Sequence, residues 1–116
     1  MKVINLTPHS ITFFQKNLEE HNTMTELMTV PPCGQLARVT TKTVVVSEGM
    51  PGLPIPVTAT EFGEVEGLPA PEEDTIYIVS SIVAQRCRDR NDVFIPNESV
   101  RDENGRIIGC CSLGRV

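Results

Sequence analysis

The segment of residues 75–87, TIYIVSSIVAQRC, constrains the fold most, because strand chemistry passes directly into helix chemistry there. Residues 75–79 are all strand formers, and four consecutive apolar residues after Thr75 are typical of a strand covered on both faces. Ser80 and Ser81 follow, and serine is a preferred residue at the N-terminal cap of a helix. The segment therefore predicts a buried strand that runs into a short helix.

One face of this predicted helix is apolar. Val79, Val83 and Cys87 recur every four residues, which places them along the inner face. The first amides of a helix have no intrahelical partner and carry the positive end of the helix dipole. The turn between strand and helix is therefore a natural place to hold an anion.

Length and charge limit the range of functions. The 116 residues predict a single domain, residues 1–116, with room for one hydrophobic core. The chain has one Tyr, four Phe and no Trp, so the core must depend on Val, Ile and Leu, which favours sheet. A formal net charge of −5 argues against binding of long nucleic acid through its phosphates. It leaves room for a small phosphorylated ligand, because a few arginines in one pocket can outweigh the average.

The cysteines and the hydropathy pattern bear on the compartment. Four cysteines, with no C-x-x-C pair and no Cys and His at ligand spacing, predict neither a secreted disulfide scaffold nor a zinc site. The adjacent Cys110 and Cys111 point to opposite faces of a predicted strand, where packing is more common than reactivity. No apolar run reaches the length of a membrane span, and residues 1–2 lead into a strand-like segment. We expect a soluble, cytoplasmic protein that does not bind membranes.

Strand patterns dominate the remaining chain. Residues 36–45 alternate strictly with period two, and residues 55–62 supply the return strand after the turn-rich segment EGMPGLP. Asn104-Gly105 suits the positive φ angles of a type I′ turn and predicts a C-terminal hairpin.

The N-terminal part is less regular. Residues 2–6 and 10–14 predict two short strands, either as a hairpin or as one bent strand, and residues 15–25 predict an exposed loop. The predicted fold class is α+β, mainly antiparallel β-sheet with one or two short helices packed on one face.

Two polar groups could bind a ligand. Ser80 and Ser81 could contact phosphate, although plain helix capping explains serine there at about two to one. A polar cluster follows the helix and contains Arg86, Arg88, Arg90, Asn91 and Asp92. Guanidinium groups match phosphate oxygens two at a time, whereas the alternative is a solvated turn whose arginines favour the helix dipole and pair with nearby aspartates. We weigh these two readings equally.

Other residue types give weaker signals. His9 and His21 lack a recognisable nucleophile partner. The strand-to-helix segment of residues 75–87 contains no G-x-S-x-G motif, the turn that carries the nucleophilic serine of a hydrolase. Phe62, Tyr77 and Phe94 are most easily core residues, although one ring at a pocket mouth could stack on a base. The residues themselves therefore nominate no catalytic group, no metal ligand and no cofactor.

Three stretches carry a resemblance to a known family: INLTPHSI (4–11), FGEVEGLPAPEEDTIYIVSSIVAQ (62–85) and RNDVFIPNESVRDENGRIIG (90–109). Together they resemble the anti-Thoeris sponges of phages, the first type of Thoeris anti-defence protein. The resemblance implies a protein that sequesters cyclic ADP-ribose isomers made by TIR-domain defence enzymes, without cleaving them. It also implies binding of cyclic oligonucleotides in some cases, a location in the infected bacterial cell, and homo-oligomers such as dimers or hexamers built from dimers.

The resemblance can be carried onto residues of this chain only in part. The positions that we match to a ligand pocket are Ser80, Ser81, Arg90, Asn91, Asp92 and Arg101. Two other functions stay open from the sequence: a ring-nuclease-like enzyme that degrades a cyclic nucleotide, and a phage protein-interaction module.

Overall fold

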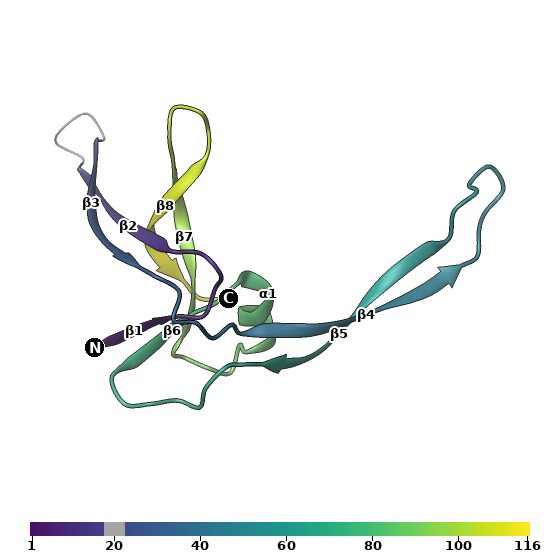
Figure 1. Ribbon diagram of the computed structural model, residues 1–116, viewed down its shortest axis with the longest axis horizontal. Coiled ribbons are helices and arrows are strands. Elements are labelled where there is room, and N and C mark those ends of the chain that lie inside the picture. Colours follow the sequence, from purple (N-terminus) through teal and green to yellow (C-terminus); the bar gives the residue numbers. More distant parts are fainter. Residues whose placement is uncertain (18–22) are drawn as a thin grey trace.

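The structure is a computed structural model that describes residues 1–17 and 23–116. Among these residues it contains eight strands and one short helix, arranged as a six-stranded sheet and a separate two-stranded sheet (Figure 1). The elements are β1 (Lys2–Asn5), β2 (Ile11–Asn17), β3 (Thr23–Val30), β4 (Arg38–Ser47), β5 (Val57–Glu66), β6 (Thr75–Ile78), α1 (Ser81–Arg86), β7 (Val93–Arg101) and β8 (Ile107–Gly114). The prediction of a mostly β protein with antiparallel pairing and one short helix is confirmed at this level.

The six-stranded sheet has the order β1-β6-β7-β8-β2-β3. The β7–β8 and β2–β3 pairs are antiparallel, as the sequence predicts for most of the sheet. The β1–β6, β6–β7 and β2–β8 pairs are parallel. Parallel neighbours need long connections, and here the connection from β1 to β6 contains β2, β3 and the β4–β5 hairpin described below.

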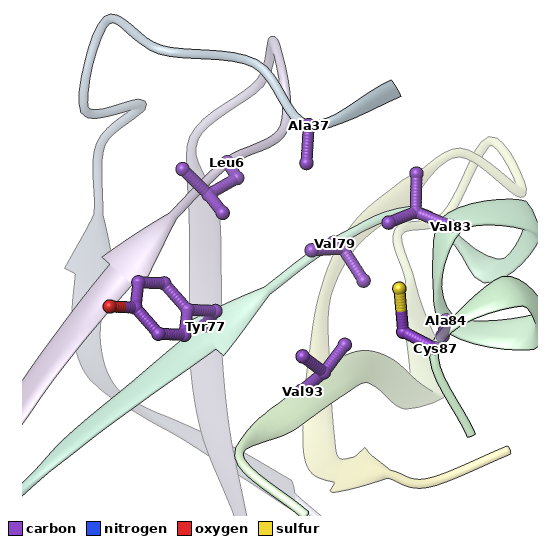
Figure 2. Close-up of a cluster of buried hydrophobic side chains, with 8 residues drawn as sticks. All are labelled: Leu6, Ala37, Tyr77, Val79, Val83, Ala84, Cys87 and Val93. Atoms are coloured by element: carbon purple, nitrogen blue, oxygen red, sulfur yellow. The ribbon is translucent and has the colours of Figure 1, made fainter. Parts of the chain in front are cut away.

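The predicted strand-to-helix unit is β6 followed by α1. Tyr77, Ile78 and Val79 are fully buried, as are Val83 and, nearly so, Cys87 on the inner face of the helix. Figure 2 shows Tyr77, Val79, Val83 and Cys87 together with Leu6, Ala37 and Val93, which come from distant parts of the chain. Ile78 belongs to a second cluster, with Ile11 and Cys110. Burial of apolar surface at this meeting point is the main source of stability for the centre of the molecule. The predicted helix and its inner face are confirmed.

The predicted hairpin or bent strand over residues 2–14 is wrong. β1 pairs with β6 and β2 pairs with β3 and β8, so the two N-terminal strands do not pair with each other. The side chain of Asn5, 1% exposed, holds the connection by donating to the carbonyls of His9 and Val30 and accepting from Thr7. These contacts satisfy a buried amide completely and direct the chain from one part of the sheet to another.

The loop predicted over residues 15–25 is also shorter than expected. Residues 15–17 belong to β2 and residues 23–25 to β3, where Asn17 donates to the Thr25 hydroxyl at 2.5 Å. Alternating cross-strand contacts of this kind extend a hairpin although its sequence lacks a clear period. The rest of the predicted loop lies outside the described residues.

The C-terminal hairpin is present, but its turn is not of type I′. Gly105 has φ +79°, whereas Asn104 does not have the positive φ that a type I′ turn requires. Instead, the Asp102 carboxylate accepts hydrogen bonds from the backbone N–H groups of Asn104 and Arg106. This side chain supports a turn that needs only one residue at positive φ.

β4 and β5 form a long hairpin that extends away from the sheet, and we call it the arm (Figure 1). Its paired residues run from Arg38–Glu66 at the base to Ser47–Val57 near the tip. In the part of the chain that the structure describes, β4 and β5 contact α1, and Val39 and Val65 near the base of the arm pack against the core. The predicted strands at residues 36–45 and 55–62 are therefore confirmed as a pair, with bounds shifted toward higher numbers.

Candidate functional site

An open hollow of about 520 Å³ lies between α1 and β5, at the base of the arm. Its lining residues are Phe62, Ser81, Ile82, Gln85, Arg86 and Arg88. The volume falls within the range of small-molecule sites, roughly 300–1,000 Å³. The hollow therefore combines an aromatic ring, two guanidinium groups and two neutral polar side chains.

Phe62 supplies the aromatic surface. It pairs with Thr41 across the arm and is 43% exposed, so the prediction that it belongs to the core is wrong. The guanidinium carbon of Arg86 lies 5.5 Å from the centre of the Phe62 ring, and its Nη2 donates to the Phe62 carbonyl at 3.4 Å. Such an exposed cation–π contact contributes only about 0.5–1 kcal/mol. Because this contact is weak, an anionic group of a ligand that binds the guanidinium more strongly can draw Arg86 away from the Phe62 ring.

The charge of the hollow is positive although the chain is acidic. Arg86 ends the helix and Arg88 follows it, so both guanidinium groups lie on exposed side chains beside the hollow. None of the described residues that line it is acidic. Two guanidinium groups without a lining carboxylate favour a phosphorylated ligand.

The two predicted serines lie at the start of α1, but they differ. Ser80 is the N-cap residue, with extended backbone angles, and its hydroxyl makes no capping hydrogen bond. Ser81 is the first helical residue and lines the hollow. The Ser80 side chain therefore does not cap the helix, although the sequence favoured that role. Ser81 is the serine that lines the hollow.

The predicted ligand residues Arg90 and Asp92 bind each other. Nε of Arg90 donates to Oδ1 of Asp92 at 2.8 Å, and Nη2 donates to Oδ2 at 2.9 Å. Nη2 of Arg90 also donates to the Pro69 carbonyl at 3.0 Å, and the guanidinium lies over the Tyr77 ring. Both charged side chains are mostly buried, with exposed fractions of 19% and 13%. The pair fixes the loop after the helix onto the core.

The protonation of this cluster follows from the pairing. The hydrogen bond from Arg90 holds the pKa of the Asp92 carboxyl below its usual value, and the same bond raises the pKa of Arg90. Burial raises the pKa of Tyr77 and of the Cys87 thiol. Each of these groups therefore stays in its ordinary charge state near neutral pH, as expected of a structural cluster.

Asn91 and Arg101 lie elsewhere. Asn91 is exposed on the loop that the Arg90–Asp92 pair holds, and it is not among the residues that line the hollow. Arg101 ends β7, six residues or roughly 20 Å of strand beyond Ile95. Its guanidinium donates to the Gly105 carbonyl at 2.7 Å across the hairpin end. The structure thus brings Ser81 to the hollow, and places Ser80 and Asn91 on its flanking turns and Arg101 at a distance.

Sequence reasoning named Arg86 and Arg88 within a larger polar cluster but chose Arg90, and not these two arginines, for the predicted ligand pocket, whereas Arg86 and Arg88 line the hollow. Their spacing gave a usable signal, because the helix ends at Arg86 and a residue two positions later stays exposed. Gln85 and Ile82 were missed, and their helical positions relative to Ser81 were the available clue.

In the part of the chain that the structure describes, no group of three or more His, Cys, Asp or Glu side chains is placed to hold a metal ion. Within the same residues, no helix is long and apolar enough to cross a membrane. Neither a family model nor a curated protein nor a solved structure matches the chain.

Proposed function

We propose that the chain is a phage-encoded anti-defence sponge that binds cyclic ADP-ribose-type immune signals in the hollow beside α1 and sequesters them without cleavage. The observation that carries the proposal is the combination of the exposed Phe62 ring with the Arg86 and Arg88 guanidinium groups in one hollow. A cyclic ADP-ribose presents a flat base and two linked phosphates, which these groups complement. The resemblance of residues 62–85 to the anti-Thoeris sponges supports the same ligand class.

The roles of the side chains follow from their chemistry. The adenine stacks on Phe62, and the phosphates take charge-assisted hydrogen bonds from Arg86 and Arg88. Ser81 and Gln85 offer a hydroxyl and an amide to ribose or base edges. Asn91 lies on the loop after the helix, outside the lining of the hollow, and the Arg90–Asp92 pair positions that loop.

Sequestration needs affinity and copy number but no reaction. A Kd near 1 nM corresponds to about −12 kcal/mol, which is within reach of stacking plus several charged hydrogen bonds. Free signal then falls below the threshold of its effector in the infected cell. Cyclic oligonucleotides are a second ligand class for the same protein, and the working form is a homo-oligomer.

Calorimetric titration with a panel of cyclic ADP-ribose isomers and cyclic oligonucleotides tests the proposal. Arg86→Ala and Arg88→Ala should each weaken binding by roughly 10- to 100-fold, since a hydrogen bond to a charged group contributes about 1.5–3 kcal/mol. Arg106→Ala is the matched control, because Arg106 is exposed on the far hairpin and its loss changes the net charge equally. Equal losses in all three variants would leave only general electrostatics, and no binding of any panel member would refute the proposal.

Two further measurements separate the other functions. Ligand that is recovered intact after long incubation and denaturation supports a sponge, whereas fragments would identify a ring-nuclease-like enzyme. A protein-interaction module would show no thermal shift, while ligand at 100 times Kd should add about 2.7 kcal/mol. Asn91→Ala should weaken binding less than either arginine variant, because it lies outside the lining.

A further inference from the structure

The Arg86 side chain lies over the aromatic ring that we assign to the base of the ligand. Its guanidinium carbon is 5.5 Å from the centre of the Phe62 ring, and its Nη2 donates to the carbonyl of the same residue at 3.4 Å. Arg86 ends α1 and Phe62 lies on β5, two elements that contact each other at the base of the arm (Figure 1). The guanidinium therefore covers the ring on the side of the helix, where the hollow lies.

A guanidinium at this position and a stacked base compete for one place. Paired aromatic rings have their centres about 4.5–7 Å apart. The guanidinium carbon of Arg86, at 5.5 Å, already lies in this range. A base can therefore stack on this face of Phe62 only after the Arg86 side chain has moved away from it.

A second arginine–aromatic contact shows by contrast that Arg86 can move. The guanidinium carbon of Arg90 lies 5.9 Å from the centre of the Tyr77 ring, but two hydrogen bonds to Asp92 fix it there and the pair is mostly buried. Arg86 is exposed, and in the described part of the chain no carboxylate lies within ion-pair distance of it. An exposed cation–π contact alone shifts an equilibrium by about 2- to 5-fold.

We propose that Arg86 determines the specificity of the hollow by making access to the Phe62 ring conditional on an anion. A phosphate that binds the guanidinium draws it from the ring, and the base then stacks on the face that is uncovered. A neutral base must displace Arg86 without this compensation. The hollow therefore selects molecules that carry a phosphate and a base together, and it discriminates against nucleosides and free bases. This proposal rests on the proposed function, because it takes the hollow as the ligand site.

The two effects of Arg86 have opposite signs in one variant. Arg86→Ala uncovers the ring, so adenosine, which has a base but no phosphate, should bind about 2- to 5-fold more tightly. The same substitution removes a charged donor, so inorganic pyrophosphate should bind about 10- to 100-fold more weakly. A role in general electrostatics or in folding would not strengthen the binding of a neutral molecule.

NMR titrations of the full chain with adenosine and with inorganic pyrophosphate, each alone, test this inversion. Arg88→Ala, in the same hollow, should weaken pyrophosphate binding and should not raise the affinity for adenosine. Arg106→Ala, on the far hairpin, should change neither affinity. In a Phe62→Leu background, Arg86→Ala should no longer strengthen adenosine binding, because the gain requires the ring.

The wild-type chain offers a second test, because coupling between two ligands is reciprocal. Pyrophosphate that draws Arg86 from the ring should raise the affinity for adenosine by up to about 5-fold, and adenosine should raise that for pyrophosphate equally. Arg86→Ala should abolish this coupling. The NMR signals of the Phe62 ring should also shift in the same direction on addition of pyrophosphate and on Arg86→Ala, since each uncovers the ring.

Three results would each overturn the proposal. The first is adenosine binding to Arg86→Ala that is equal to or weaker than binding to the wild type, which would mean that the base does not compete with the guanidinium. The second is the absence of positive coupling between pyrophosphate and adenosine in the wild type. The third is a wild type that binds neither probe.

Failure of this proposal can be told from failure of the proposed function. If the inversion and the coupling are found but no cyclic ADP-ribose isomer binds, the hollow is an anion-dependent nucleotide site and the proposed function fails. If a cyclic ADP-ribose isomer binds in the hollow but Arg86→Ala does not strengthen adenosine binding, the proposed function stands and the role of Arg86 in specificity fails.

Discussion

The side chain of Asn5 offers the sharpest test of how the centre of the fold is held. Its Nδ2 donates to the carbonyls of His9 at 2.7 Å and Val30 at 3.0 Å. Its Oδ1 accepts from the N–H of Thr7 at 2.9 Å and from the Thr7 hydroxyl at 2.6 Å. One buried amide thus joins the turn after β1 to the end of β3.

Replacing Asn5 by Ala leaves three backbone groups without this partner. Leaving the buried Val30 carbonyl without this donor should lower the free energy of unfolding by about 1–3 kcal/mol. Loss of the acceptor for the Thr7 amide should lower it by about 0.5–1.5 kcal/mol. The His9 carbonyl is compensated, because the Thr7 hydroxyl lies 3.0 Å from it and can turn toward it. We expect a loss of about 3 kcal/mol in the free energy of unfolding, out of the 5–15 kcal/mol usual for a domain.

Asn5→Asp sharpens the test because it keeps the shape and changes the charge. The new carboxylate would face the carbonyl oxygens of His9 and Val30 instead of donating to them. The folded state therefore favours the protonated form, so the stability deficit should grow as the pH rises through the carboxyl pKa, near 3.9 when unfolded.

Urea unfolding followed by circular dichroism measures both variants, with Asn17→Ala as the control. Asn17 makes its contacts at the exposed end of β2, so the control should change stability by less than about 0.5 kcal/mol. A loss below about 1 kcal/mol in Asn5→Ala would refute the reasoning, since buried unsatisfied carbonyls cost more than that. So would an Asn5→Asp deficit that is equal at low and neutral pH.

Three further predictions concern other parts of the molecule. The lowered pKa of Asp92, caused by the hydrogen bond from Arg90, contributes stability above pH ~4 that is lost as the pH falls through the lowered pKa; Asp92→Asn should flatten this acid-side decline in urea unfolding. Gly109→Ala should cost about 1–3 kcal/mol in the same assay, because an added Cβ would collide with backbone and ring atoms of β2. Maleimide should label exposed Cys33 quickly in the folded protein, whereas buried Cys110, whose pKa is raised by burial, should react only after unfolding, as peptide mass mapping would show.

Local patterns predicted the strand-to-helix unit correctly. Val79, Val83 and Cys87 are buried as their spacing indicates, because the core-facing side of a helix is set by neighbours three and four residues apart. Prediction failed where the partner is distant in sequence. Asn5 makes a contact with Val30, 25 residues away, and no local pattern separates that arrangement from a simple hairpin.

The binding residues show the same division. The sequence does not distinguish Arg86, Arg88 and Arg90. In the structure, the Arg90 guanidinium donates hydrogen bonds to Asp92 and to the carbonyl of Pro69, 21 residues earlier, so it is not available to a ligand. The hydrophobicity of Phe62 favoured a place in the core. The sequence does not show that its strand, β5, belongs to the arm and not to the six-stranded sheet. Which arginine stays available, and which ring stays exposed, depends on tertiary contacts.

The location of the hollow relative to the resembling stretches decides which variants are informative. Phe62, Ser81, Ile82 and Gln85 lie within residues 62–85, whereas Arg86 and Arg88 fall between that stretch and the next, which begins at residue 90. The resemblance therefore covers the ring and the helix that shape the hollow, but not the two charges beside it. Much of the same stretches also builds the core through β6, α1 and β7. A likeness there is expected of any chain with this core, so the arginines, which the core does not need, are the residues on which ligand binding must be tested.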